Sequence, residues 1–235
     1  KMKKIITAIA FIALSTVSAK AVDLGMFSVT AGYASNSGVY GATGVQTNED
    51  GDGGTFRTNK ASGVFVDGHS SQFIELGLGQ YFSVGYEVSP DSISTPTNTT
   101  REGEGTETSV QVDFNDLTTT YVKVELPVGI YARYGNVETD LDIKETMTSG
   151  STYKNVSTSG TLAALGYSKA FGDSGLAVRF EGAYLEFDNV KTNNGIAKGT
   201  VNIASGSVNF NEVEAKNMEG LQGKVALTYT LGGNK

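Results

Sequence analysis

The sequence has no cysteine, no tryptophan, one histidine and three prolines in 235 residues. Without cysteine it can form no disulfide framework, no cysteine-ligated zinc site and no thiol nucleophile. A single histidine also excludes a metal site built from several histidines. The formal net charge of −7 offers no basic face for a phosphate backbone, so we expect no nucleic-acid partner.

The first 21 residues have the layout of a secretory signal peptide. Three of the first four residues are lysine, the run from Ile5 to Val17 is short and mostly apolar, and Ala19-Lys20-Ala21 fits a cleavage site. The run is shorter than the ~20 residues of a transmembrane helix. We predict a signal peptide over 1–21 and one domain over 22–235. The leader carries four lysines and no acid, so its removal changes the net charge from −7 to −11.

The remaining chain shows apolar residues at alternate positions. Eight segments carry this pattern over about ten residues, which is typical of strands that cross an outer membrane. No other apolar run is long enough for a transmembrane helix, and without helices only a closed barrel pairs every backbone group in lipid. The segments span 25–35, 71–79, 82–89, 118–126, 129–139, 160–171, 176–188 and 218–232.

The connections alternate in length, with short turns on one side and long polar segments on the other. This arrangement is typical of outer-membrane barrels, and it places both ends of the chain on the periplasmic side. The sequence therefore predicts an all-β fold: an eight-stranded antiparallel up-and-down transmembrane β-barrel with short periplasmic turns and long extracellular loops, in a Gram-negative outer membrane. Alternation within Val201–Phe210 leaves open a barrel of ten strands. The short turns are at 79–81, 127–128 and 172–175, and the long segments are at 36–70, 90–117, 140–159 and 189–217.

Charged residues gather on the polar face of the predicted strands. A soluble barrel would turn these charges to water, whereas a membrane barrel turns them into the lumen. The alternation fits both, and the signal peptide, the loop lengths and the zero sum of the charges favour the membrane. An eight-stranded lumen has room only for side chains, and buried charges must be paired. We therefore predict a lumen plugged by a charged network of Glu75, Glu87, Lys123, Glu125, Arg133, Arg179, Glu181 and Lys224.

Five motifs carry a family resemblance: Gly25–Tyr33, Asn115–Thr118, Leu126–Arg133, Gly150–Asn155 and Gly175–Gly182. Their order and spacing resemble the small outer-membrane β-barrel family typified by the OmpA transmembrane domain and OmpX. The chain looks closer still to the glycine-rich outer-membrane barrels of marine alphaproteobacteria. The resemblance implies a non-enzymatic barrel that contacts outer-membrane lipid and lipopolysaccharide, is inserted by the barrel assembly machinery, and presents loops to surface ligands or phage.

The end of the chain resembles the assembly signal of such barrels, in which a glycine is followed by alternating apolar residues that end in an aromatic. The matching residues are Gly223, Val225, Leu227, Tyr229 and Leu231. This chain departs from the family by continuing through Gly232 to Lys235.

The single histidine lies in His69-Ser70-Ser71. A histidine and a serine with this spacing would suit an esterase, since histidine must deprotonate the hydroxyl, and lipid A deacylases of this barrel size use such a pair. In those enzymes the pair lies near the end of the chain, and no oxyanion motif accompanies it here. We therefore expect a solvent-exposed loop histidine and no enzyme. A small-solute channel and a lipid-modifying barrel enzyme are the alternatives.

A weak metal candidate lies in the first long segment. Asn48, Asp50 and Asp52 occupy positions 1, 3 and 5 of an EF-hand-like loop, followed by the expected glycine. Position 12 is Asn59 rather than a bidentate glutamate. A flexible acidic loop is therefore favoured, and the sequence predicts neither a metal nor a cofactor.

Overall fold

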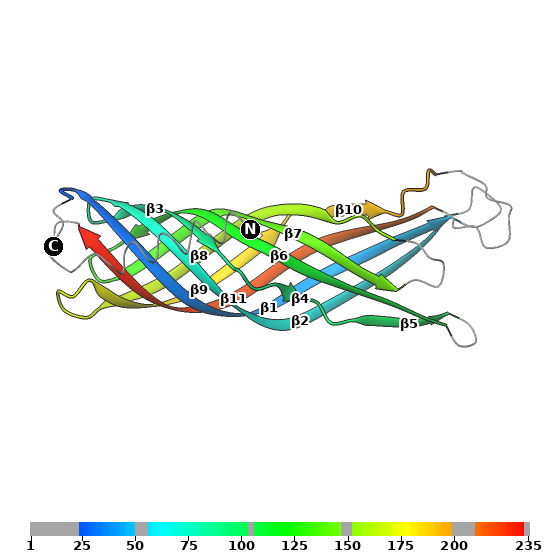
Figure 1. Cartoon of the computed structure of the whole chain (residues 1–235), viewed down its shortest axis with the longest axis horizontal. Coiled ribbons are helices and arrows are strands. Elements are labelled where there is room, and N and C mark those ends of the chain that lie inside the picture. The colour runs from blue at the N-terminus through cyan, green and yellow to red at the C-terminus, as the bar shows by residue number, and fades with distance from the viewer. Residues whose placement is uncertain (1–23, 50–55, 103–105, 147–151, 199–209, 233–235) are drawn as a thin grey trace.

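The computed structural model describes residues 24–49, 56–102, 106–146, 152–198 and 210–232. In these ranges no helix is long and apolar enough to cross a membrane. The chain forms antiparallel strands (Figure 1). They are β1 (Phe27–Glu49), β2 (Phe56–Leu78), β3 (Phe82–Val88), β4 (Ile93–Ser94), β5 (Asn98–Glu102), β6 (Thr106–Glu125), β7 (Ile130–Thr146), β8 (Val156–Ala170), β9 (Leu176–Phe187), β10 (Val190–Asn193) and β11 (Asn211–Gly232).

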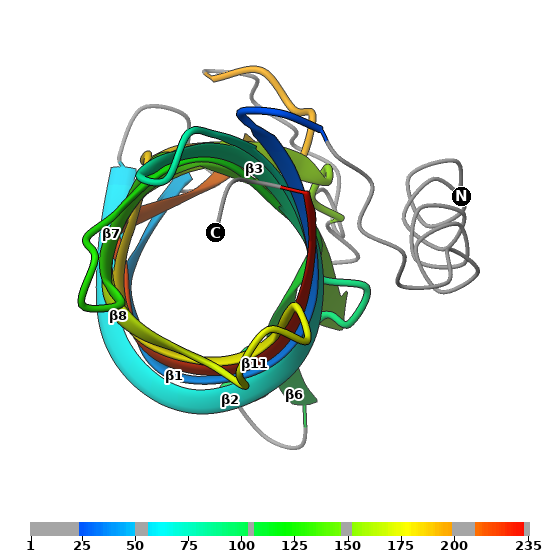
Figure 2. The same ribbon diagram turned by 90° about the vertical axis from the view of Figure 1, so that its left-hand side faces the viewer.

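Eight strands of the described chain close into a ring, which Figure 2 shows end-on. Their order is β1-β2-β3-β6-β7-β8-β9-β11, and β11 pairs back with β1 from Ser28↔Gly232 to Asn48↔Asn211. The short strands β4 and β5 pair with β6, and β10 pairs with β11. The predicted eight-stranded antiparallel barrel is confirmed. Most of Val201–Phe210 lies outside the described residues.

The tight connections lie at one end of the barrel, where the sequence places them. Gly79, Gly129, Gly172 and Gly175 have positive φ values in these turns, a conformation that glycine adopts without steric cost. The first residues of β1 and the last of β11 lie at the same end (Figure 1). Both described ends of the barrel are therefore on the short-turn side.

Several strands are much longer than the sequence predicts. The segment 36–70 is not a loop, because β1 continues to Glu49 and β2 begins at Phe56. Each of these strands has 23 residues and would be roughly 75 Å long if fully extended. A β-strand needs only about 9–11 residues to cross a membrane. The wall of the barrel therefore continues far beyond the membrane on the side opposite the tight turns (Figure 1). We call this part the projection.

The half of the barrel near the turns has an apolar outer surface. Leu76 is 52% exposed, Leu165 68% and Phe180 51%, while the preceding residue of each strand, Glu75, Ala164 and Arg179, faces inward and is buried. A soluble protein would bury such side chains, so this band is the surface that faces lipid.

A cluster of apolar side chains fills the interior on the projection side. We call it the apolar layer; its larger members are Tyr40, Ile93, Leu117, Val137, Leu162, Leu185, Phe187 and Met218. Charged side chains fill the interior nearer the turns, and these form the candidate site.

Candidate functional site

All eight charged residues that the sequence singles out turn towards the interior. Seven of them are buried, and Glu125, with its side chain 28% exposed, lies at the end of β6 near the tight turns. They come from β2, β3, β6, β7, β9 and β11, and the alternation of each strand sets their direction. We call the seven buried residues the ionic layer: Glu75, Glu87, Lys123, Arg133, Arg179, Glu181 and Lys224.

Glu75 is the centre of one half of the ionic layer. The Arg179 guanidinium donates to both of its carboxylate oxygens, at 2.7 and 2.9 Å. Lys123 Nζ lies 3.0 Å from Glu75 Oε2, and the Tyr121 hydroxyl donates to Oε1 at 3.0 Å. Lys123 Nζ also donates to Glu125 at 3.0 Å, so it links the layer to the periplasmic rim.

Glu87 is the centre of the other half. Lys224 Nζ lies 2.7 Å from both carboxylate oxygens, and Arg133 Nη1 donates to Oε2 at 2.8 Å. The Ser71 hydroxyl donates to Oε1 at 2.6 Å and accepts from the Asn36 amide at 2.9 Å. Lys224 and Arg133 therefore neutralise the buried Glu87 carboxylate, Ser71 orients it, and Asn36 orients Ser71.

Glu181 provides further links within the network. Its Oε2 lies 3.2 Å from Arg133 Nε, and its Oε1 lies 3.6 Å from Lys224 Nζ. The Arg133 guanidinium also stacks over the Tyr121 ring at 4.1 Å, and this ring belongs to the Glu75 half. Every charge of the ionic layer has an opposite charge beside it, which a buried charge requires.

Glycines make room for the long side chains of the layer. A Cβ at Gly85 would lie 2.3 Å from Cζ of Tyr121, and one at Gly32 would lie 2.1 Å from Cζ of Phe73. Such approaches are far inside van der Waals contact, so these inward positions accept no larger residue without movement of the rings. The sequence signals these positions, because the glycines share the polar face of the strands.

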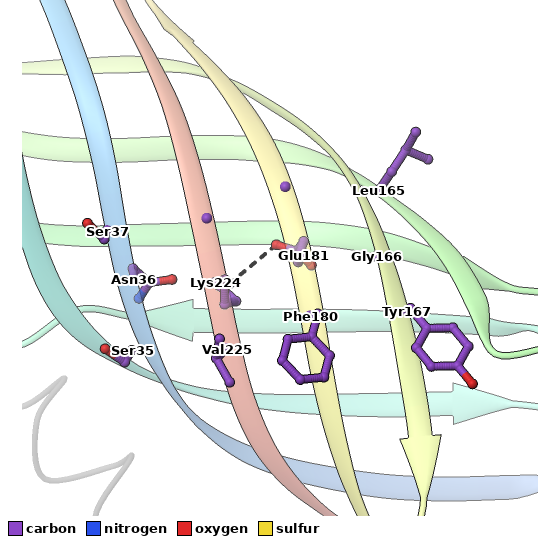
Figure 3. Close-up of a pocket in the computed structure, with 12 residues that line it drawn as sticks. Ser35, Asn36, Ser37, Leu165, Gly166, Tyr167, Phe180, Glu181, Lys224 and Val225 are labelled. Atoms are coloured by element: carbon purple, nitrogen blue, oxygen red, sulfur yellow. Dashed lines mark ion pairs between the residues drawn. The ribbon is translucent and has the colours of Figure 1, made fainter.

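One stretch of the wall carries glycines on its outer face. Gly182 of β9 and Gly223 of β11 are paired directly across the two strands. A cavity of about 790 Å³ includes both glycines in its lining, together with outward Phe180 and Val225 (Figure 3). The same view shows the inward ion pair of Lys224 and Glu181 on these strands.

The prediction of a solvent-exposed loop histidine is wrong. His69 lies within β2, faces inward and is only 6% exposed, because β2 extends past the predicted strand. Ser70 turns the other way, and its hydroxyl donates to Asp91 at 2.5 Å. The Ser71 hydroxyl donates to Glu87. Both serine protons are thus directed to carboxylates.

The metal candidate falls largely outside the described residues. Asn48 lies near the end of β1, and Asp50 and Asp52 are not described. Within the described ranges no group of three or more His, Cys, Asp and Glu side chains could hold a metal ion.

The residues of the proposed assembly signal share the outward side of β11. Val225 is 49% exposed and Leu227 57%. Gly223, Tyr229 and Leu231 occupy further alternate positions of the same strand.

Sequence reasoning missed the uncharged members of the site. Asn36, Ser71 and Tyr121 are buried and hydrogen-bond within the network. Each of them occupies one of the alternate positions of its strand that face inward, and this position is the sequence feature that marks it. Ser71 and Tyr121 were missed because the prediction counted only formal charges, and Asn36 because it lies in segment 36–70, which was predicted to be a loop.

Comparison with known proteins identifies the fold. The sequence matches no family model and no curated protein. Among solved structures, OprG from Pseudomonas aeruginosa is 9% identical over 86% of this chain and 96% of its own, with a TM-score of 0.56. OmpT from Escherichia coli is 12% identical over 92% and 100% of the chains (TM-score 0.43), and Ail of Yersinia pestis is 9% identical over 85% and 99% (TM-score 0.34). The similarity to OprG shows the fold of an outer-membrane β-barrel, which supports the predicted location.

Proposed function

We propose that this protein is a non-enzymatic outer-membrane barrel with a closed lumen, which anchors a projecting β-sheet used in envelope structure and surface recognition. The observation that carries the proposal is the ionic layer. Its pairs join strands that are not neighbours in the ring: Glu75 of β2 meets Arg179 of β9, and Glu87 of β3 meets Lys224 of β11. Such pairs extend across the interior.

The apolar layer adds a second obstacle to solutes. Leu162 and Leu185 are buried inside the barrel beyond the ionic layer, and Val137 is fully buried with them. A hydrated ion that reached them would have to shed water without gaining a polar partner, which costs several kcal/mol. The two layers in series favour a plug over the alternative of a small-solute channel.

The projection supplies the recognition surface. Val64 is 74% exposed and Val66 71%, on the part of β2 that continues beyond the lipid-facing band. Val66 is paired directly with exposed Val39, and Val39 with exposed Leu221. Contiguous exposed apolar side chains of this kind often mark an interaction site.

The hydrogen bonds that the two serine hydroxyls beside His69 donate support a role without catalysis. Ser70 and Ser71 donate to Asp91 and Glu87, so neither directs its proton to His69. We further propose that lipid and lipopolysaccharide contact the apolar band, and that the barrel assembly machinery inserts the protein by recognising the pattern of β11. We also propose that the protein is related to OmpA- and OmpX-like barrels.

Planar-bilayer recording of the refolded full chain tests the proposal. We expect no steady openings, and steady open channels in the wild type would overturn the closed lumen. A variant that opens both layers, with Glu75→Ala and Arg179→Ala combined with Leu162→Ala and Leu185→Ala, should admit ions more often, whereas Glu125→Gln at the rim should not. A heat-dependent mobility shift on SDS gels shows that each variant is folded.

A separate assay tests the absence of catalysis. The refolded protein is incubated with lipopolysaccharide, and the acyl chains of lipid A are measured. We expect no change. Acyl release that disappears in His69→Ala would replace the proposal with a lipid-modifying enzyme.

A further inference from the structure

A small cavity lies where the ionic layer meets the apolar layer. Its volume is about 10 Å³, close to the space that a single water molecule needs. Its lining combines polar side chains, among them His69, Glu181 and Lys224, with apolar side chains such as Leu162 and Leu185. The cavity is therefore both polar enough and large enough for one water.

Two buried polar atoms of this lining have no hydrogen-bond partner among the described residues. They are Nδ1 of His69 and Oε1 of Glu181. Buried polar atoms are almost always hydrogen-bonded, so each of these calls for a partner. A carboxylate oxygen can only accept, and a neutral imidazole nitrogen accepts when the proton is on the other nitrogen. Both atoms can be satisfied by one donor molecule.

Lys224 shows where such a molecule would sit. Its Nζ donates to both carboxylate oxygens of Glu87 at 2.7 Å. An ammonium has three protons, so one proton of Lys224 is left for a further partner. Its distance to Glu181 Oε1 is 3.6 Å, which is too long for a direct hydrogen bond. A polar contact longer than 3.5 Å raises the question of a water that hydrogen-bonds to both groups. The oxygen at the far end of this gap is the same oxygen that lacks a partner.

We propose that the cavity binds one ordered water, which accepts a hydrogen bond from Lys224 Nζ and donates to Glu181 Oε1 and to His69 Nδ1. Three hydrogen bonds are the usual number for a buried water. The arrangement requires a neutral His69 with its proton on Nε2. It gives the single histidine a positioning role: it holds the water that completes the surroundings of Glu181.

The histidine makes the test direct, because it is the only one in the sequence and its ring signals need no further assignment. The full chain is refolded in detergent micelles with ¹⁵N-labelled histidine. We expect the ring nitrogens to show a neutral imidazole protonated at Nε2, and a ring proton to show magnetisation transfer from a long-lived water. A proton on Nδ1, or a ring with no contact to bound water, would overturn the proposal.

A matched pair of variants locates the water. Ala183 lines the cavity and is 3% exposed, so Ala183→Val places two methyl groups in the space of the water. Ala163 of β8 is exposed and faces outward, so Ala163→Val makes the same change outside the barrel. We expect the water contact of His69 to disappear in the first variant and to persist in the second.

Persistence in Ala183→Val would place the water elsewhere and overturn the assignment. The heat-dependent mobility shift shows whether each variant folds. If Ala183→Val does not fold, the wild-type spectrum alone decides. A His69 ring protonated at Nδ1, or one without a contact to bound water, contradicts the proposal without the variant.

Discussion

The two ends of β7 obey opposite rules. In β7, Arg133 faces inward and is 4% exposed, while Tyr134 faces outward and is 60% exposed. A few residues further on, apolar Val137 faces inward and charged Glu138 faces outward. The direction of alternation is unchanged, and only the chemistry of the two faces is exchanged. β9 shows the same exchange between the pair Phe180 and Glu181 and the pair Leu185 and Glu186.

This difference shows that the medium outside the barrel determines what is inside. Near the turns the outer medium is lipid, so the outward side chains are apolar and the polar ones are enclosed. In the projection the outer medium is water, and β7 and β9 follow the rule of a soluble barrel, with charged side chains outward and apolar ones inward. The exchange places the membrane surface near Tyr134 on β7 and near Tyr184 on β9.

The largest expected effect comes from removing the central acid of the ionic layer. Glu75→Ala leaves Arg179 and Lys123 without their main buried partner, and breaking a buried pair from one side costs about 3–5 kcal/mol. Unfolding by urea in lipid vesicles, followed by circular dichroism, measures the loss. Glu125→Gln at the partly exposed rim is the control and should cost less than ~1 kcal/mol. Equal losses would mean that the layer contributes no specific stability.

The apolar layer should respond through packing rather than charge. Leu185 is 2% exposed inside the barrel, so Leu185→Ala should cost ~2–4 kcal/mol through lost burial and the cavity left behind. Leu165 is 68% exposed on the lipid-facing side and provides the matched control. The same vesicle unfolding experiment applies to both. A loss for Leu165→Ala as large as that for Leu185→Ala would contradict the assignment of inner and outer faces.

Substitution of one inward and one outward glycine by alanine compares the packing of the inner and outer faces near the turns. Gly85→Ala brings a methyl group against the Tyr121 ring, and overpacking of this kind costs about 1–3 kcal/mol. At outward Gly182 an added Cβ meets no atom within 4 Å, so Gly182→Ala should be neutral or slightly stabilising. The recovery of heat-shifted protein after refolding compares the two variants. The reverse order would contradict the packing described for the lumen.

The sequence predicted the half of the barrel near the turns well. Alternation of apolar residues marked the strands, and the charges of residues such as Glu75 and Arg179 showed that the opposite face needs partners. Partners could not be assigned, because Glu75 and Arg179 are 104 positions apart and meet only when the ring closes. Pairing across a lumen depends on the stagger of all the strands together.

The projection was missed for a different physical reason. The outer face of segment 36–70 mixes polar residues such as Ser62 with the exposed valines Val39, Val64 and Val66, so it lacks the regular apolar band on which the sequence prediction rested, and the segment was predicted to be a loop. His69 was assigned to a loop as a consequence, although it lies within β2 and is buried. Phe65 lies inward against Tyr40 and Ser62 lies outward, but the outward Val64 and Val66 on either side of Phe65 hide this change of the apolar face from the sequence pattern.

The smallest expected effect lies in the projection, at the hydrogen-bonded ion pair of Asp113 and Lys144 on β6 and β7. The hydrogen bond from Lys144 holds the pKa of Asp113 below its ordinary value of 3.8. A lowered pKa means that the ionised carboxyl stabilises the fold above 3.8 and that this stabilisation disappears as the pH falls through the lowered value. Because the Lys144 side chain is 57% exposed, we expect only a small change in unfolding midpoint for Asp113→Asn at neutral pH. Midpoints measured in steps from neutral pH to below the lowered pKa of Asp113 should begin to converge near 3.8 and meet below that lowered value, whereas a constant difference would show that Asp113 acts through packing and not through its charge.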